Sequence, residues 1–562
     1  MRLHKYVVPT LLVTVSLAQC VYSRVNYSLI EANIPEDGRL NFTQLALKYG
    51  QKCEEHDVVT EDGYILTIFN IPGNKSRPIL LMHGLLDSAD TFIIRGKSSL
   101  AIALAADGYD VWFGNCRGNK YGRRHTSLDP DKDKKKFWDF SFHEFGVYDA
   151  PATIDYVLNL TNLTKLPVIG HSQGNLMFYV LGSDRPEYND KIEIMIALAP
   201  ICHLNHVKGL SAVIAAVWPT VSDFLALLGI EEIFRSDSII PNGVTKVICT
   251  QSLGYDLCAK GAVFPVTGND PDELEPEFFP VVIGHFPAGT SRKDADHQSQ
   301  LASKKNFAHF DYGVVKNVIK YRSPLPPVYD LNKVSMPIAI FAGKNDYISD
   351  LEDVERLRSQ LPNVVYYHVM ERDLMNHIDF VWGKNMGHYL FPLIFDVLKE
   401  YRKCEEHAVI TEDGYILTVF NVKGDKSKPV LLMHGIVDSS DTFIFIPILA
   451  GHYPDAVSTK NGDHLAQVAV KRRFCKFDYG LVGNYRVYGS AEPPDYQLGN
   501  VRLPVALLVG KNDDLATVQD VAQLRARLPN VVLYHEMERA LFNHIDFVLG
   551  NNMGENLFTL RP

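Results

Sequence analysis

Short apolar runs alternate with helical stretches through the first two thirds of the chain. The continuous runs cover residues 78–82, 109–113, 166–169, 192–198, 337–342 and 364–370. Runs of this length without polar alternation indicate strands that are buried on both faces of a sheet. Their alternation with helices predicts an α/β fold, with a mostly parallel central sheet and helices on both faces. In such a sheet, the functional site lies where the carboxyl ends of the strands meet.

The third run is followed by Gly170-His171-Ser172-Gln173-Gly174 and a helical stretch. A G-x-S-x-G motif between a strand and a helix is typical of a turn that exposes a nucleophilic serine. The glycines are needed because side chains there would collide with the neighbouring backbone. The pattern predicts Ser172 as the nucleophile. The structural alternative is a glycine-rich turn that packs a helix on a strand.

A nucleophilic serine needs a base, and the base needs an orienting carboxylate. Asp346 follows the run at 337–342, and His377 follows the run at 364–370. Taken singly, an aspartate in such a turn usually caps a helix, and a lone histidine is usually structural. The order serine, aspartate, histidine at successive strand ends predicts a triad. Asp350, Asp353 and Asp379 are the alternative carboxylates.

Acyl transfer also needs donors for the developing oxyanion, usually two backbone amides. One expected donor is the amide of Gln173, which directly follows the nucleophile. The other is the amide of Leu85, because Gly84 permits a close turn after the first strand run. His83 is interpreted as a structural loop histidine.

The chain repeats itself. The segment beginning CEEHDVVTEDGYILTIFN at Cys53 recurs as CEEHAVITEDGYILTVFN at Cys404, an offset of 351 residues. GKND at 343–346 and NHIDF at 376–380 recur with an offset of only 167 residues. The two offsets differ by 184 residues, which are missing from the middle of the second copy. We place the first copy at residues 30–401 and the truncated copy at 404–562.

The missing stretch includes the serine turn and the strands around it. The second copy retains Asp513, His544 and the loop at 434–436, but it has no nucleophile. A parallel sheet without its middle exposes long strand edges. We therefore expect residues 404–562 to lack hydrolase activity and to fold poorly alone. One hypothesis is a fusion of two gene copies, and the alternative is a lipid-binding or regulatory appendage.

The first 22 residues indicate a secretory signal, because basic residues precede a short apolar run that ends in small residues. This predicts a secreted or lysosomal protein. A second apolar stretch, residues 210–229, is interrupted by Pro219, so we expect buried or lid helices and no stable transmembrane segment. The sequence also has five potential glycosylation sites: Asn26, Asn41, Asn74, Asn159 and Asn162.

Composition adds little that is specific. The net charge of −10 gives no reason to expect nucleic-acid binding. There are eight cysteines, and Cys249 and Cys258 are separated by nine residues, which suits a disulfide in an oxidising compartment. No CxxC pair or His/Cys cluster predicts a metal site. Nothing in the sequence indicates the oligomeric state.

The first copy closely resembles the acid lipase family, which includes gastric and lysosomal acid lipases and insect gut relatives. The matching motifs are EDGYIL at 61–66, HGLLDSADTF at 83–92, GNCRGNKYGRRHTSLDP at 114–130, FWDFSFHEFGVYDAPATIDY at 137–156, GHSQG at 170–174, FDYG at 310–313 and NHIDFVWG at 376–383. They lie in order and span nearly all of residues 30–401. The resemblance implies an α/β-hydrolase fold.

The resemblance also implies functional features. The implied triad is Ser172, Asp346 and His377, with Leu85 and Gln173 as oxyanion donors. A cap and lid are implied at about 202–317, together with a Cys249–Cys258 disulfide. The implied substrates are triacylglycerols or sterol esters at a lipid interface, and no cofactor is needed. The alternatives are an esterase for soluble acyl substrates and a non-catalytic lipid carrier on the same fold.

Overall fold

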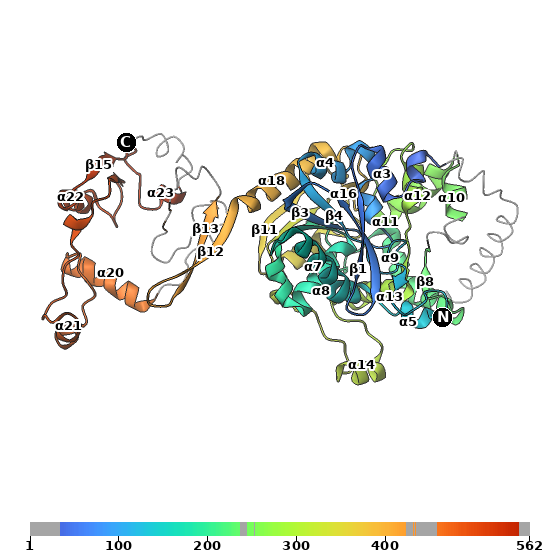
Figure 1. Ribbon diagram of the computed structural model, residues 1–562, viewed down its shortest axis with the longest axis horizontal. Helices are drawn as coiled ribbons and strands as arrows, with labels where there is room; N and C mark the ends of the chain where they lie inside the picture. Colours follow the sequence, from blue (N-terminus) through green and yellow to red (C-terminus); the bar gives the residue numbers. More distant parts are fainter. Residues whose placement is uncertain are drawn as a thin grey trace. The chain divides into compact units, whose positions relative to one another are not determined.

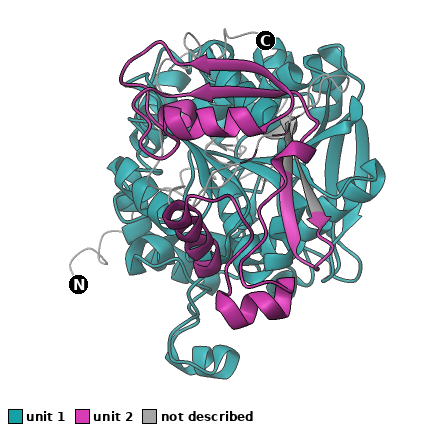
Figure 2. Cartoon of the chain, turned by 90° about the vertical axis from the view of Figure 1, so that its left-hand side faces the viewer, with its two compact units in different colours: residues 1–402 teal, residues 403–562 magenta. Residues whose placement is uncertain are grey.

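The computed structural model describes residues 34–235, 244–251, 253–422, 431, 433 and 458–549. Contacts within the chain divide it into two compact units, residues 1–402 and 403–562, drawn in teal and magenta in Figure 2. The expected signal segment 1–22, the potential glycosylation site Asn26 and the second-copy loop 434–436 lie outside the described residues.

Unit 1 is built on one nine-stranded sheet (Figure 1). Its strands are β1 (Glu54–Val59), β2 (Tyr64–Ile71), β3 (Asn74–Met82), β4 (Tyr109–Phe113), β5 (Arg124–His125), β6 (Leu166–His171), β7 (Ile192–Leu198), β10 (Ile338–Ala342) and β11 (Val364–Val369). The order is β1-β2-β4-β3-β6-β7-β10-β11, and β5 pairs with β2. All neighbours from β4 to β11 are parallel, whereas β2 is antiparallel to its partners. The α/β-hydrolase architecture expected from the sequence is confirmed.

Hydrophobic cores lie on both faces of this sheet. Along β3, Ile79 and Leu81 join one core and Leu80 and Met82 join the other, because successive side chains of a strand point to opposite faces. The first core includes residues of α3 (Phe42–Lys48), α4 (Leu100–Ala106), α16 (Asp379–Trp382), α17 (Met386–Tyr389) and α18 (Phe391–Lys403). The second includes residues of α5 (Lys134–Phe137), α6 (Phe142–Glu144), α7 (Ala150–Thr161), α8 (Gln173–Asp184) and α15 (Leu351–Gln360). Edge strand β11 is only half-buried, unlike the other expected strands.

The chain between β7 and β10 forms an insertion, here called the cap, which contains the cap and lid predicted at about 202–317. Its elements are α9 (Gly209–Leu227), β8 (Glu232–Ile233), α10 (Val244–Cys249), the π-helix η7 (Tyr255–Val263), α11 (Phe264–Thr267), α12 (Phe279–His285), β9 (Thr290–Ser291), α13 (Arg292–Lys304) and α14 (Val314–Tyr321). A disulfide joins Cys249 of α10 to Cys258 of η7, as the family resemblance implies.

Helix α9 differs from the sequence-based expectation in one way, because Pro219 does not interrupt it. Its side chains are exposed or half-buried except for the buried Ser222, so α9 is not a core helix, and the lid alternative stays a prediction. A proline removes the hydrogen bond to the carbonyl four residues earlier. Here that carbonyl, on Ala215, accepts a hydrogen bond from Ser299 Oγ of α13 at 3.1 Å, which helps the helix to continue. By length and composition, α9 could also cross a membrane.

Unit 2 carries two separate two-stranded sheets in its described part. They are the antiparallel pair β12 (Cys404–Ile410) and β13 (Ile416–Val422), and the parallel pair β14 (Val505–Val509) and β15 (Val531–Glu536). Its helices are α20 (Thr459–Lys471), α21 (Gly480–Tyr488), α22 (Val518–Arg527) and α23 (Asp546–Leu549). Strand β14 is mostly half-exposed, whereas its counterpart β10 is fully buried between β7 and β11.

Candidate active site

Ser172 stands in the sharp turn between β6 and α8. Its backbone has φ 54° and ψ −118°, a conformation that non-glycine residues rarely adopt and that is often found at functional sites. A Cβ atom on Gly174 would lie 2.4 Å from the Met82 carbonyl oxygen, and one on Gly170 would lie 2.6 Å from the Asn175 side-chain oxygen. Both glycines of the motif are therefore required by close packing around the serine.

Two further loops bring a histidine and a carboxylate to this serine. His377, between β11 and α16, places Nε2 2.7 Å from Ser172 Oγ. Its Nδ1 lies 2.8 Å from Asp346 Oδ2, in the loop after β10. The other oxygen of Asp346 accepts hydrogen bonds from the amides of Ile348 and Ser349 at 2.8 and 2.7 Å. The strand order β6-β7-β10-β11 explains why residues more than 200 positions apart meet at one sheet edge.

The three alternative carboxylates are engaged elsewhere. Asp350 caps α15 through the Glu352 amide, and Asp353 binds both the amide and the ring of His206. Asp379 accepts a hydrogen bond from the Asn376 amide. Only Asp346 among the four contacts the His377 ring within the described residues.

The turn after β3 lies against the serine, as an oxyanion loop requires. A Cβ atom on Gly84 would lie 3.2 Å from Ser172 Cβ, so this loop passes directly beside the nucleophile. Leu85 follows Gly84 immediately, and Gln173 begins α8. The Gln173 amide belongs to the first helical turn, where N–H groups have no partner within the helix. The expected donors therefore belong to residues directly next to Gly84 and Ser172 in the chain, and their role stays a prediction.

His83 supports the same loop. Its Nδ1 donates a hydrogen bond to the Gly84 carbonyl at 2.8 Å, and its Nε2 accepts from the Cys116 amide at 3.2 Å. Burial lowers the pKa of His83 to about 4, which favours the neutral ring this pattern requires. These contacts agree with the structural interpretation.

Sequence reasoning missed two cap residues that hold Gln173. The Gln173 side-chain amide donates to Asp294 Oδ2 at 3.1 Å, and its carbonyl oxygen accepts from Gln298 Nε2 at 2.5 Å. Thr290 donates to the same Asp294 oxygen at 3.0 Å. Asp294 is fully buried, and burial raises its pKa to about 7. No local motif marks these α13 residues, because their relation to Gln173 exists only in three dimensions.

His171, the residue before the nucleophile, also contacts the histidine loop. Its Nε2 donates a hydrogen bond to the His377 carbonyl oxygen at 2.9 Å. Burial, together with the nearby His377 ring, lowers the pKa of His171 to about 3. A neutral His171 thus anchors the backbone of His377 without placing a positive charge beside it.

One cluster among the described residues could hold a metal ion, although the sequence predicted none. Ligand atoms of His143, Asp184 and His309 lie within 4.8 Å of one another. His309 Nε2 is 3.2 Å from Asp184 Oδ2, and His143 bonds the Tyr329 hydroxyl at 2.8 Å. Asp184 ends the twelve-residue helix that begins after Ser172. Since a helix rises 1.5 Å per residue, the backbone of Asp184 lies roughly 18 Å along the helix from Ser172.

The four described potential glycosylation sites, Asn41, Asn74, Asn159 and Asn162, are all exposed. The Asn41 side chain also accepts the Gln44 amide as the N-cap of α3. Exposure is a requirement for modification, and glycosylation itself stays a prediction.

Comparisons with known proteins show the family of the chain. A family model described as a partial alpha/beta-hydrolase lipase region matches residues 42–96 and 400–446, one segment in each copy. A model of the alpha/beta hydrolase fold matches residues 77–218. Lipase 1 of Drosophila melanogaster is 40% identical over 369 residues, covering 65% of this chain and 81% of that protein. The chain belongs to the α/β-hydrolase lipase family.

Two mammalian relatives extend the comparison. Gastric triacylglycerol lipase of Bos taurus is 34% identical over 377 residues, covering 65% of this chain and 93% of that protein. Lipase member K of Homo sapiens is 32% identical over 379 residues, covering 66% and 93%. The matched lengths are close to that of unit 1, and the fold and family together make this chain a carboxylic ester hydrolase.

Proposed function

We propose that unit 1 hydrolyses carboxylic esters of neutral lipids, triacylglycerols or sterol esters, through an acyl-enzyme on Ser172. The observation that carries the proposal is the hydrogen-bonded chain from Ser172 Oγ to His377 Nε2 and from His377 Nδ1 to Asp346 Oδ2, at 2.7 and 2.8 Å. This arrangement fits a serine nucleophile whose base is oriented by a buried carboxylate.

In the first half-reaction, Ser172 Oγ attacks the ester carbonyl carbon while its proton passes to His377 Nε2. Asp346 holds the ring so that Nδ1 keeps its proton, and it stabilises the imidazolium that forms. The amides of Leu85 and Gln173 donate to the oxyanion. His377 then protonates the leaving alcohol, and the bond between carbonyl carbon and alcohol oxygen breaks. In the second half, His377 activates a water that releases the fatty acid.

The cap supplies positioning and access. Through its hydrogen bonds to Gln173, Asp294 acts as a positioning residue for one oxyanion donor. Ser172 and His377 are both nearly buried, so a lipid ester needs an opening in the cap. The exposed apolar helix α9 is suited to a lid, and Trp218 Nε1 ties it to Asp296 of α13 at 2.8 Å. Contact of α9 with a lipid surface would favour opening.

Active-site labelling tests the proposal. The full chain should react with a fluorophosphonate, and the modified peptide should contain Ser172. Ser172→Ala should abolish both labelling and ester hydrolysis. Emulsified long-chain triacylglycerol should be hydrolysed faster than a soluble short-chain ester. Lipid binding without labelling would support the carrier alternative, and a strong preference for the soluble ester would support the esterase alternative.

The localisation of the protein is part of the same proposal. The N-terminal signal pattern, the potential glycosylation sites and the Cys249–Cys258 disulfide all fit a secreted or lysosomal protein. Lipid esters at an interface are the expected substrates in either compartment.

A further inference from the structure

Helix α14 (Val314–Tyr321) projects from unit 1 at the end of a hairpin, and both views of the chain show it away from the body of the unit (Figures 1 and 2). Its apolar side chains face solvent. The exposed fractions are 63% for Val314, 73% for Val315, 49% for Val318 and 78% for Ile319. A contiguous aliphatic surface of this kind on a projecting element commonly marks a contact site.

The helix has three faces with different roles. At 100° per residue, the four aliphatic residues occupy one arc, and Lys316 and Lys320 occupy the next. Asn317 and Tyr321 form the third arc, which faces the hairpin itself. Asn317 donates to Asp311 Oδ1 at 2.7 Å and to the Pro324 carbonyl at 3.0 Å. The Tyr321 hydroxyl donates to the Phe310 carbonyl at 2.9 Å. The inner arc thus holds the apolar arc outward.

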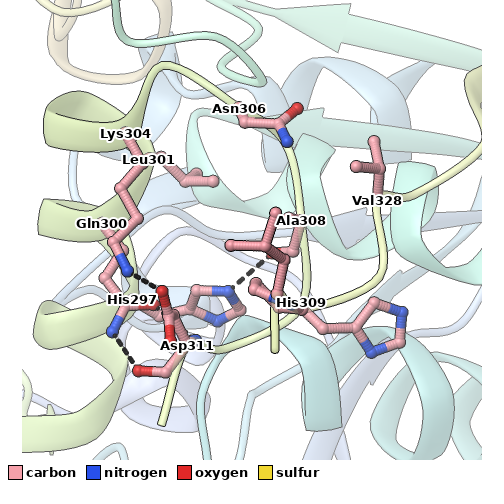
Figure 3. A pocket seen from close by; sticks show the side chains of 11 residues that line it. His297, Gln300, Leu301, Lys304, Asn306, Ala308, His309, Asp311 and Val328 are labelled. Atoms are coloured by element: carbon pink, nitrogen blue, oxygen red, sulfur yellow. Dashed lines mark hydrogen bonds and ion pairs between the residues drawn. The ribbon is translucent and has the colours of Figure 1, made fainter. Parts of the chain in front are cut away.

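The base of the hairpin is attached to the cap helix α13. Gln300 and Asp311 exchange two hydrogen bonds: the Gln300 amide donates to the Asp311 carbonyl at 3.0 Å, and the Asp311 amide donates to Gln300 Oε1 at 2.7 Å (Figure 3). Beside them is a cavity of about 250 Å³ lined by residues such as His297, Leu301 and Val328. These hydrogen bonds attach the base of the hairpin to α13, so the exposed helix stands on an anchored segment.

Unit 2 has a matching exposed helix on a hairpin, although it lacks the nucleophile. Helix α21 (Gly480–Tyr488) exposes Leu481, Val482 and Tyr485 by 64%, 72% and 57%. Its Asn484 donates to Asp478 Oδ1 at 2.7 Å, and Gln467 and Asp478 exchange the same pair of backbone-directed hydrogen bonds. The copy that lost the catalytic turn kept an exposed apolar hairpin, so the role of this surface is separable from catalysis.

Charge and size indicate what the surface contacts. Residues 312–325 contain Lys316, Lys320 and Arg322 and no acidic residue, whereas the whole chain has a net charge of −10. An aliphatic face bordered by basic side chains is the composition of a helix that lies in a membrane interface. A stable protein interface needs about 800 Å² per partner, and lysines are depleted there. An eight-residue helix is only about 12 Å long, so it is too small for such an interface.

We propose that the α14 hairpin is a contact site for an anionic lipid surface. Val314, Val315, Val318 and Ile319 enter the interface, and Lys316, Lys320 and Arg322 pair with anionic headgroups. This inference goes beyond the proposed function, because it requires none of the residues assigned to ester hydrolysis.

The test uses the full chain with Ser172→Ala, so that no lipid is consumed. Sedimentation measures binding to phosphatidylcholine vesicles with and without phosphatidylserine. Val315→Ser/Ile319→Ser should weaken binding to the anionic vesicles by at least about tenfold, because two aliphatic side chains no longer insert. Lys316→Gln/Lys320→Gln should weaken binding at low salt and flatten its salt dependence. Leu47→Ser/Val59→Ser removes two aliphatic residues of similar exposure elsewhere in unit 1 and should bind as the parent does.

Apolar residues of α9 or α21 that bind vesicles themselves would hide the effect of the α14 variant, so a local measurement is also needed. Hydrogen exchange of peptides covering 312–322 should slow when anionic vesicles are added. Unchanged exchange there, or equal slowing of this exchange in the Val315→Ser/Ile319→Ser variant and its parent, would overturn the proposal. Loss of self-association in that variant, with vesicle binding intact, would assign the surface to a second copy of the chain and also overturn it. None of these outcomes depends on ester hydrolysis, which is tested by labelling of Ser172.

Discussion

The side-chain amide of Gln173 lies 3.1 Å from the carboxylate of Asp294, and this hydrogen bond joins the residue after the nucleophile to the cap. Asp294 Oδ1 has no hydrogen-bond partner among the described residues, although it is buried. The cap therefore does more than cover the site. It helps to fix the start of α8, where an oxyanion donor is expected.

Substitution of Asp294 should separate positioning from binding. Asp294→Leu should lower kcat by about ten- to a hundredfold, less than the loss of an oxyanion donor, with little change in KM. Asp294→Asn retains an acceptor for Gln173 and should stay within about threefold of the parent. Steady-state kinetics on a soluble ester would measure both. An unchanged kcat in Asp294→Leu would remove the positioning role.

The same carboxyl should make stability depend on pH. Burial raises its pKa to about 7 in the folded chain, above the ordinary value of 3.8. Between those two values the folded state binds more protons than the unfolded state. The contribution of Asp294 to the free energy of unfolding is therefore full below about pH 4 and is lost as the pH rises through 7. When the pH is raised from 4.5 to 7.5, the unfolding free energy of the parent should therefore fall by about 3 kcal/mol more than that of Asp294→Asn.

Urea unfolding at the two pH values would measure this difference. Asp373→Asn is a suitable control, because Lys344 lowers the pKa of the Asp373 carboxyl and its titration lies below this pH range. An equal pH dependence in Asp294→Asn and the parent would show that Asp294 does not retain its proton in the folded chain.

The repeat provides a matched pair of histidines. His377 contacts Asp346 and Ser172, whereas His544 contacts Asp513 at 2.9 Å in a copy without the serine turn. The His377 side chain is 5% exposed and that of His544 is 52% exposed. His377→Gln should reduce kcat by about 10⁴-fold, and His544→Gln should leave it unchanged. A comparable loss in His544→Gln would mean that unit 2 contributes to hydrolysis.

The turn around the nucleophile should not tolerate a methyl group. In Gly174→Ala, the new Cβ would lie 2.4 Å from the Met82 carbonyl oxygen, so helix α8 or strand β3 must shift. We expect a loss of about 1–3 kcal/mol in unfolding free energy and a large loss of fluorophosphonate labelling. Gly387→Ala is the control, because its nearest atom would be 3.9 Å away. Normal labelling of Gly174→Ala would contradict the close packing.

Local sequence determined most of the fold and the main chemistry. Continuous apolar runs predicted the strands of the parallel part of the sheet, because a strand buried on both faces has no polar alternation. The glycines around Ser172 marked the turn, and strand order constrained where Asp346 and His377 lie. The truncated copy also follows from the sequence alone, because its motifs recur at two different offsets.

Tertiary structure decided what depends on contacts between distant segments. It brought Asp294 and Gln298 into hydrogen bonds with Gln173, and it put Asp346, not one of the other three carboxylates, beside the His377 ring. It also showed α9 continuing through Pro219 with a partner from α13, and α14 carrying its aliphatic residues into solvent. Periodicity shows which residues share a face of a helix. It does not show what that face meets, because burial is set by neighbours brought together only when the chain folds.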